Sequence, residues 1–236
     1  MGTPYEQIRV PAQDGTLLQI DHLPDVQDLV SILESEAVPL QHWWDLARAY
    51  LAQGRAQQYL ELLQSSLDPE FLKAVEDFFK RRPSFEIVLM ICGIAAHHTE
   101  QYRAEPDKAA KQEHYSAALA RVNAAKQEGP AEQLPWLASG ALALAKGDLN
   151  SAMAEFKQAA ARTHNGRPNC AGQLAQAQLH FNAGRLSEAL AIYKQVLQRH
   201  PWAPAEVRLG LAACYFKAGR MDLAQAAYER CVCVFV

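Results

Sequence analysis

Residues Cys170 to Pro201, CAGQLAQAQLHFNAGRLSEALAIYKQVLQRHP, form the stretch that decides the fold. In its first half, Leu174, Ala177 and Phe181 recur at three- and four-residue spacing, which places them on one apolar face of a helix. Gly184 then allows the left-handed backbone conformation that a tight exit from a helix requires. The second half has its own apolar face, and the proline ends it because proline lacks an amide hydrogen. The stretch therefore predicts a helical hairpin.

The pattern recurs along the chain, with the turn glycine marking its phase. Gly219 lies 35 residues after Gly184, Gly147 lies 37 residues before it, and Gly54 marks a fourth copy. Because one such hairpin cannot bury its hydrophobic face alone, phased copies predict that the hairpins stack on one another. Bulky apolar residues, glycine and alanine recur around the markers: Trp43, Leu46, Ala47, Tyr50 and Leu63; Trp136, Gly140, Ala152, Phe156 and Ala159; Leu211, Ala212, Tyr215, Ala224 and Tyr228.

This period resembles that of the tetratricopeptide repeat, which is about 34 residues. The resemblance implies an all-α superhelix, or solenoid, preceded by a short non-repeat N-terminal arm. We expect residues 1–38 to form the arm and a first helix, and residues 39–236 to form the repeat array. Within the array, residues 84–128 lack the turn glycine and predict a longer, degenerate hairpin, which Gly129-Pro130 separates from the regular copies.

Residues near the N-terminus have a different pattern. Ile8 and Val10, then Leu18 and Ile20, alternate about Asp14-Gly15, which predicts a β-hairpin or, alternatively, a tail that orders on a partner. Helices are expected to begin where capping residues precede apolar runs. These caps are Asp25, Asp68 and Ser84, and the corresponding helices extend to about Glu36, Lys80 and Arg103; a further helix is expected from Lys108 to Glu128.

Composition favours a soluble helical protein. Half of the 236 residues are hydrophobic and β-branched runs are scarce, as in all-helical proteins. The net charge of −3 gives no electrostatic sign of direct nucleic-acid binding. The longest apolar run, Ile87 to Ala96, is about half a membrane span, and the N-terminus has no basic-then-apolar signal layout. We therefore expect no direct contact with nucleic acid or membrane.

The residues that usually carry chemistry are present only in weak patterns. Cys231 and Cys233 are one spacer short of a zinc pair, and the five cysteines are best explained as thiols in a reducing compartment. Adjacent His97 and His98 point about 100° apart on a helix, so they cannot easily share one metal ion with His114. The chain lacks a glycine-rich phosphate loop and a Gly-x-Ser-x-Gly motif. These observations predict no metal, cofactor or catalytic residue, and hence no enzyme.

Two motifs go beyond a generic repeat. The first combines Asp21–Pro24, Val30–Leu33, Trp43 and Tyr50–Gly54, and the second is Pro204–Gly210, PAEVRLG. In this order they resemble the N-terminal region of the large tetratricopeptide subunit of the RNA polymerase II-associated factor complex. The resemblance implies a nuclear, non-catalytic scaffold that organises the other subunits and links RNA polymerase II indirectly to histone-modifying enzymes. Members of that family are several times longer, so the chain is interpreted as a fragment.

Spacing also predicts a partner-binding groove. In stacked hairpins the first helices line the concave face, and bulky apolar groups exposed there bind helical or extended apolar segments of protein partners. The residues expected to line this groove are Trp44, Arg48 and Leu51; Leu134, Leu137, Ala141 and Leu144; Leu174, Gln178 and Phe181; and Leu209, Ala213 and Phe216.

An alternative function is that of a generic tetratricopeptide adaptor, or a co-chaperone-like protein that binds an acidic peptide tail. Such binding needs several Lys, Arg and Asn side chains converging in the groove to pair with carboxylates. The matching positions offer Arg48 but otherwise apolar residues such as Trp44, Leu174 and Leu209, which disfavours this alternative. The Lys80-Arg81-Arg82 cluster is interpreted as the cationic last turn of a helix, where the dipole favours positive charge.

Overall fold

The computed structural model describes residues 8–11, 17–20, 23–165, 167–201 and 203–232. Its backbone contacts divide the chain into two compact units, Met1–Pro130 and Ala131–Val236. The boundary falls at the Gly129-Pro130 pair that the sequence pattern places between the long hairpin and the regular copies. Each unit is described by itself.

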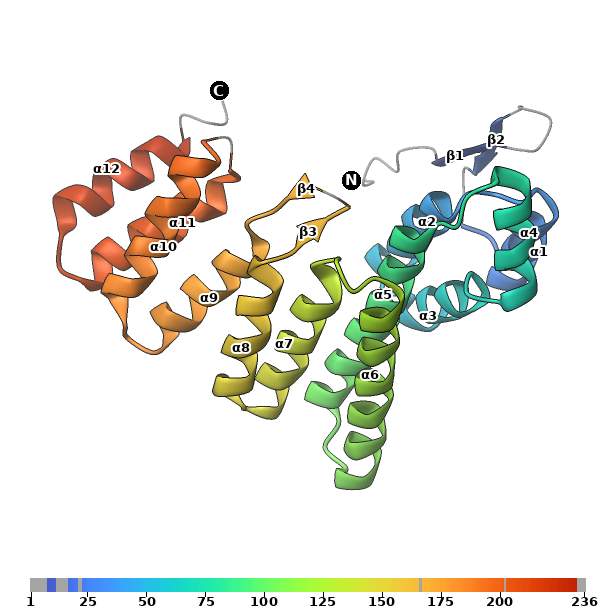
Figure 1. Ribbon diagram of the computed structural model, residues 1–236, viewed down its shortest axis with the longest axis horizontal. Coiled ribbons are helices and arrows are strands. Elements are labelled where there is room, and N and C mark those ends of the chain that lie inside the picture. The colour runs from blue at the N-terminus through green and yellow to red at the C-terminus, as the bar shows by residue number, and fades with distance from the viewer. Residues whose placement is uncertain (1–7, 12–16, 21–22, 166, 202, 233–236) are drawn as a thin grey trace. The chain divides into compact units, whose positions relative to one another are not determined.

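The first unit begins with a short β-hairpin and continues as helices (Figure 1). The hairpin pairs Ile8 with Ile20 and Val10 with Leu18, which confirms the predicted alternation; the Asp14-Gly15 turn lies outside the described residues. The elements are β1 (Ile8–Pro11), β2 (Leu17–Ile20), α1 (Val26–Ser35), α2 (Leu40–Ala52), α3 (Ala56–Ser65), α4 (Pro69–Phe79), α5 (Ser84–Ala104) and α6 (Lys108–Glu128).

The core of the first unit is centred on two fully buried aromatic residues of α2. The indole Nε1 of Trp43 donates a hydrogen bond to the Val38 carbonyl at 3.2 Å, and its ring lies 4.8 Å from that of Phe71 in α4. The hydroxyl of Tyr50 donates to the Pro24 carbonyl at 2.9 Å. Because buried polar groups must be paired, these bonds fasten the segment before α1 and the α1–α2 loop to the first repeat.

Capping side chains precede three of the six helices described in this unit, α1, α4 and α6. Asp25 accepts from the Gln27 amide at 3.0 Å, and Asp68 accepts from the Glu70 amide at 2.9 Å, so both predicted caps are confirmed. The predicted cap at Ser84 is wrong. Pro83 occupies the cap position without a side-chain hydrogen bond, and α5 begins one residue earlier than expected, with Ser84 inside its first turn.

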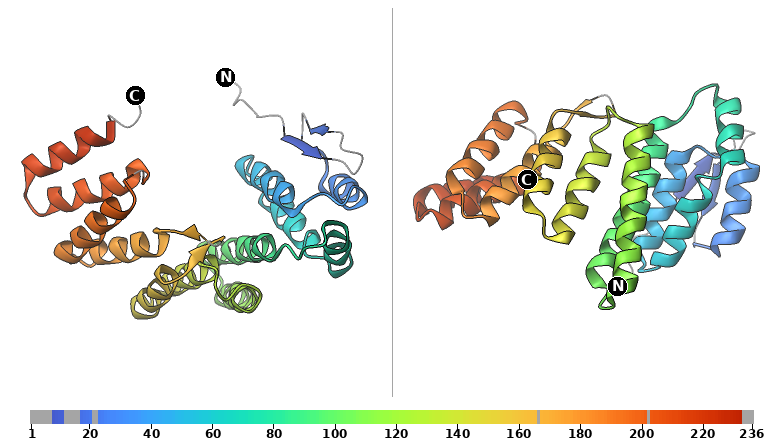
Figure 2. Two further views of the ribbon diagram at one scale, coloured as in Figure 1. Left: turned by 45° about the horizontal axis from the view of Figure 1, so that its top comes forward. Right: turned by 60° about the horizontal axis from the view of Figure 1, so that its bottom comes forward.

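The predicted long hairpin is formed by α5 and α6, which run side by side (Figure 2). Each helix has 21 residues, and no glycine ends α5. The apolar core of α5 is confined to residues 87–95. Beyond it the two helices contact each other through rings: His98 with His114 at 5.8 Å and Tyr102 with Tyr115 at 5.6 Å between centroids.

The second unit contains the regular hairpins, in which each helix packs against the next. A short β-hairpin between α8 and α9 was not predicted from the sequence. The elements are α7 (Leu134–Lys146), α8 (Leu149–Ala160), β3 (Thr163–His164), β4 (Arg167–Pro168), α9 (Ala171–Asn182), α10 (Leu186–Arg199), α11 (Ala205–Lys217) and α12 (Met221–Val232).

The four phase-marking glycines all adopt the left-handed conformation. Their φ angles are 75° at Gly54, 88° at Gly147, 74° at Gly184 and 72° at Gly219. At the third of these, the amide of Arg185 donates back to the His180 carbonyl at 2.9 Å, which closes the helix end. The predicted hairpin at 170–201 and its phased copies are therefore confirmed.

Glycines inside helices serve a different purpose, which is close packing. A Cβ atom at Gly210 in α11 would lie 2.5 Å from the ring of Tyr193 in α10, and one at Gly140 in α7 would overlap the ring of Phe156 in α8. Both rings belong to buried residues. The aromatic side chains thus occupy the space that the missing side chains leave. The predicted all-α tetratricopeptide-repeat fold is confirmed.

Candidate functional site

The predicted groove residues share one feature, which is that none of them belongs to the buried core. Each set contains a triplet with i, i+4, i+7 spacing on one first helix of a hairpin, so its members lie on one helix face; Leu134 precedes the triplet of α7 by three residues. Large apolar members are exposed: Leu51 at 48%, Leu209 at 43% and Phe216 at 57%. The polar members Arg48 and Gln178 are exposed, and the half-buried members are Trp44, Leu134, Leu137, Ala141, Leu144, Leu174, Phe181 and Ala213.

In the first unit, the triplet lies on α2. Trp44 packs against α5, since a Cβ atom at Gly93 would lie 2.9 Å from its Cζ3 atom. Part of the indole therefore contributes to helix packing as well as to the surface. Leu51, one turn before Gly54, and Arg48 leave most of their side chains to solvent.

In the second unit, two members of the α9 triplet contact residues of α10 and α11. Leu174 and Phe181 pack against the core cluster that includes Tyr193 and Val207. The Lys217 ammonium lies 4.0 Å from the centroid of the Phe181 ring, a cation–π distance. On α7, Leu137 and Leu144 pack instead against the cluster of Ala152, Phe156 and Leu179.

Two residues of the PAEVRLG motif, Arg208 and Gly210, have structural roles between α10 and α11. The Arg208 guanidinium donates to the carbonyls of Ala203 at 2.8 Å and Pro201 at 2.7 Å, so it fastens the loop between α10 and α11. Gly210 admits the Tyr193 ring. Arg208 therefore does not contribute to the predicted groove.

The histidines of the long hairpin lie near one another. His97 and His98 have ring centroids 5.8 Å apart, and His98 lies 5.8 Å from His114. Burial is the main cause that lowers the pKa of His97 and of His98. Nearby His114 lowers both values further, and His97 and Arg121 add to the effect on His98. Within the part of the chain that the structure describes, no group of three potential ligands could hold a metal ion.

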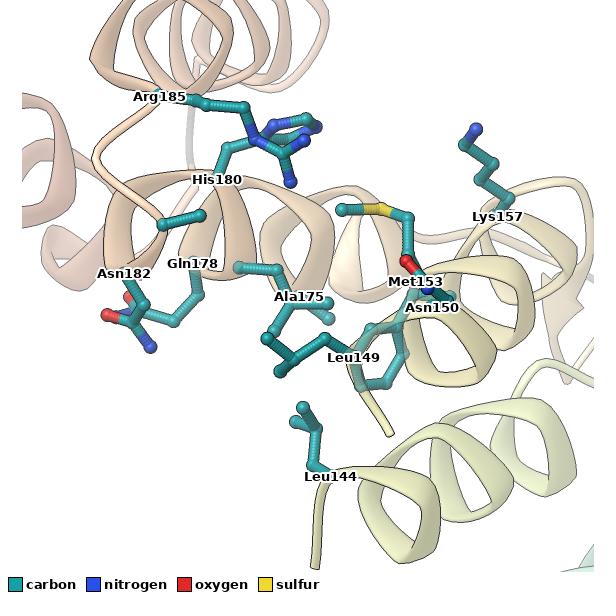
Figure 3. A pocket seen from close by; sticks show the side chains of 13 residues that line it. Leu144, Leu149, Asn150, Met153, Lys157, Ala175, Gln178, His180, Asn182 and Arg185 are labelled. Carbon is teal, nitrogen blue, oxygen red and sulfur yellow. The ribbon is translucent and has the colours of Figure 1, made fainter. Parts of the chain in front are cut away.

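The sequence did not predict a cavity of about 800 Å³ in the second unit (Figure 3). It lies among α7, α8, α9 and the turn before α10, and Leu144 and Gln178 are the predicted groove residues that line it. The remaining lining comes from α8, from other positions of α9 and from the turn before α10, which the groove expectation left out. An apolar residue exposed directly after a helix cap, Leu149, is the sequence signal that could have indicated it.

Among the described helices, none is long and apolar enough to cross a membrane.

The described cysteines, Cys92, Cys170, Cys214 and Cys231, are free thiols, and burial raises the pKa of Cys92 to about 12.

The chain is similar to several known proteins. Residues 180–231 match the tetratricopeptide repeat family, and a thermophilic tetratricopeptide-repeat protein of Thermus thermophilus superposes with a TM-score of 0.49, at 22% identity, over 75% of this chain and 100% of its own. The chain is 32% identical over 227 residues to the protein "CTR9 homolog" of Arabidopsis thaliana, and 23% identical over 230 residues to "RNA polymerase-associated protein CTR9" of Caenorhabditis elegans. Each alignment covers 94% of this chain and 20% of the relative. The resemblance found in the sequence is thus confirmed: the chain is similar to CTR9 proteins along 94% of its length and spans about a fifth of theirs.

Proposed function

We propose that this chain is a non-catalytic protein–protein interaction scaffold in a polymerase-associated factor complex. The observation that carries the proposal is the similarity to CTR9 proteins along 94% of the chain. In this role it organises the other subunits in the nucleus and links RNA polymerase II indirectly to histone modification during transcription elongation. It does so without direct contact to nucleic acid or membrane.

The proposed partner surfaces are the groove triplets of each unit, on α2 in the first and on α7, α9 and α11 in the second. Large exposed apolar groups on a soluble protein favour an interaction site, and Leu51, Leu209 and Phe216 are such groups. Bulky anchors near the middle of an interface commonly contribute most of its binding energy. An apolar helix or an extended segment of another subunit matches these i, i+4, i+7 faces. In this proposal residues 1–38 form the N-terminal arm and a first helix, and residues 39–236 form the repeat array.

Affinity purification from nuclear extract tests the proposal. The tagged chain should recover the other subunits of the complex, and Leu209→Ala/Phe216→Ala should recover much less of them. Phe78→Ala is the matched control, because Phe78 is an equally exposed aromatic residue on α4, outside the triplets. Recovery of chaperones or of unrelated acidic-tailed proteins alone would favour the adaptor alternative, and recovery of a small molecule alone would favour an enzyme.

A further inference from the structure

The cavity among α7, α8, α9 and the turn before α10 has an apolar floor. Met153 and Leu149 of α8, Leu144 of α7, and the buried Phe156 and Leu179 line it. Leu149 leaves 59% of its surface exposed. A volume of about 800 Å³ is large enough to take one or two bulky side chains of a ligand.

Cationic side chains lie on the cavity wall. Lys157 on α8 and Arg185 before α10 both line it, and neither forms an ion pair with any residue that the structure describes. Figure 3 shows Met153 between Lys157 on one side and His180 and Arg185 on the other. The Nδ1 atom of His180 is buried and has no hydrogen-bond partner among the described residues.

The charges of the lining residues are one-sided. No Asp or Glu is among the residues that line the cavity. Outside the lining, Glu188 lies in the first turn of α10. Its pKa is lowered mainly by a hydrogen bond from the Ser187 hydroxyl and less strongly by His180 and Arg185. Because Lys157 and Arg185 line the cavity and no carboxylate does, the cavity is suited to an anionic ligand group.

We propose that the cavity binds an acidic peptide segment of a partner protein. One leucine- or methionine-sized side chain of the segment fills the apolar floor, and carboxylates beside it pair with Lys157 and Arg185. The amides of Asn150 and Asn182, which also line the cavity, supply donors for the peptide carbonyls. The inference rests on the proposed scaffold function, because it names the chemistry of one partner segment.

Selection of peptides on the full chain tests this proposal. A display library of random 12-residue peptides should yield sequences rich in Asp and Glu next to Leu, Met or Phe. A selected peptide, labelled with fluorescein, should bind Lys157→Glu/Arg185→Glu at least about tenfold more weakly in fluorescence anisotropy, because opposite charges become like charges. Its affinity should also fall several-fold between about 50 and 500 mM salt.

Two further variants separate the cavity from general effects of charge. Arg199→Glu is the matched control, because Arg199 lies in the last turn of α10 as Lys157 lies in that of α8, but outside the cavity lining. It should change the peptide affinity less than about twofold. Leu149→Ser should weaken binding about fivefold through loss of apolar contact and leave the thermal midpoint unchanged, since this side chain is exposed.

Three outcomes would overturn the proposal: no enrichment of acidic peptides, equal binding by the charge-reversed variant, or a concentration-dependent dimer that this variant dissociates. In the last case a second copy of the chain occupies the cavity. If complex subunits still co-purify while no acidic peptide is selected, the cavity proposal fails and the scaffold function stands. If acidic peptides are selected but no subunit co-purifies, the scaffold function fails and the cavity site stands.

Discussion

The two helices of the α9–α10 hairpin and those of the α5–α6 hairpin pack together through different kinds of contact. In the first, helices of 12 and 14 residues meet at a left-handed glycine, and the buried Tyr193 of α10 packs against Gly210 of α11. In the second, helices of 21 residues continue past their apolar core and meet through imidazole and phenol rings. A repeat can therefore lengthen where polar aromatic contacts replace apolar packing.

The largest expected effect concerns the regular hairpin. Tyr193→Ala should lower the free energy of unfolding by about 3–5 kcal/mol, because the ring is 5% exposed and its removal leaves a hole beside Gly210. Tyr102→Ala in the long hairpin should cost less than about 2 kcal/mol, since Tyr102 is half-buried. Urea unfolding of both variants measures the difference. Equal losses would contradict the distinction between the two hairpins.

Trp136 provides a sharper version of this test. Its place in the repeat pattern predicts that it fills an inter-helix hole as Tyr193 does. In the structure it is half-buried, with the Arg162 guanidinium 3.7 Å from its ring centroid. Trp136→Ala should therefore destabilise the chain less than Tyr193→Ala, by about 2 kcal/mol, in the same urea titration.

The next effect concerns binding and compares a surface-only residue with one that also packs. Phe216→Ala should weaken binding of co-purifying subunits by about 2 kcal/mol and leave the thermal midpoint within a few degrees. Trp44→Ala should weaken binding similarly but also lower the midpoint, because the indole packs near Gly93. Isothermal titration calorimetry and thermal circular dichroism measure the two quantities. Normal binding by both variants would place the interface elsewhere.

A smaller effect concerns acid and is specific to the long hairpin. The pKa values of His97 and His98 lie below the ordinary 6.5, so folding favours their neutral forms. Their contribution to stability is present above that value and is lost as pH falls through the lowered pKa. The free energy of unfolding, measured with urea, should thus fall by about 1 kcal/mol or less between about pH 7 and 5, and by less in His98→Gln. A pH-independent midpoint would contradict this.

The smallest effect concerns the Lys80-Arg81-Arg82 cluster. The prediction that it forms the last turn of a helix is wrong, because α4 ends at Phe79 and the cluster follows it. Arg82 donates to Glu128 of α6 through two 2.9 Å hydrogen bonds, which lower the pKa of that carboxyl group. Because the guanidinium is half exposed, Arg82→Ala should cost less than about 1 kcal/mol. The loss should vanish in acid, as pH falls through the lowered pKa of Glu128. Arg81→Ala, whose contact with Glu86 spans 3.6 Å, is the control and should cost even less in urea unfolding.

Hairpin positions could be predicted because periodicity, turn glycines and caps are local features. The ends of α9 and α10 agree with the expected unit to within a residue or two, and Asp25 and Asp68 cap their helices as expected. The start of α5 was off by one residue because Pro83 and Ser84 are both good candidates for a first turn. Exposure on the first helices also followed from spacing, as at Phe216.

The rest depends on contacts that no local pattern encodes. The β3–β4 hairpin is held by the buried Gln133, whose side-chain amide donates to the carbonyls of Ala159 at 3.0 Å and Asn169 at 3.4 Å. A single polar residue of this kind gives no periodic signal. The cavity was missed for the same reason, since it joins Lys157 and Arg185 from different helical segments.

The two classes of glycine described above have different freedom to change over evolutionary time. Around the turn positions Gly54, Gly147, Gly184 and Gly219, an added Cβ atom would meet nothing within 4 Å, so only the positive φ opposes substitution. Lys80 already ends α4 at a φ of 53° without being glycine. A repeat can therefore lose the residue by which sequence searches detect it and keep its backbone. Gly210 lacks that freedom, because an added Cβ atom would overlap the Tyr193 ring. We therefore expect glycine to be retained at this helical position more strictly than at the turns.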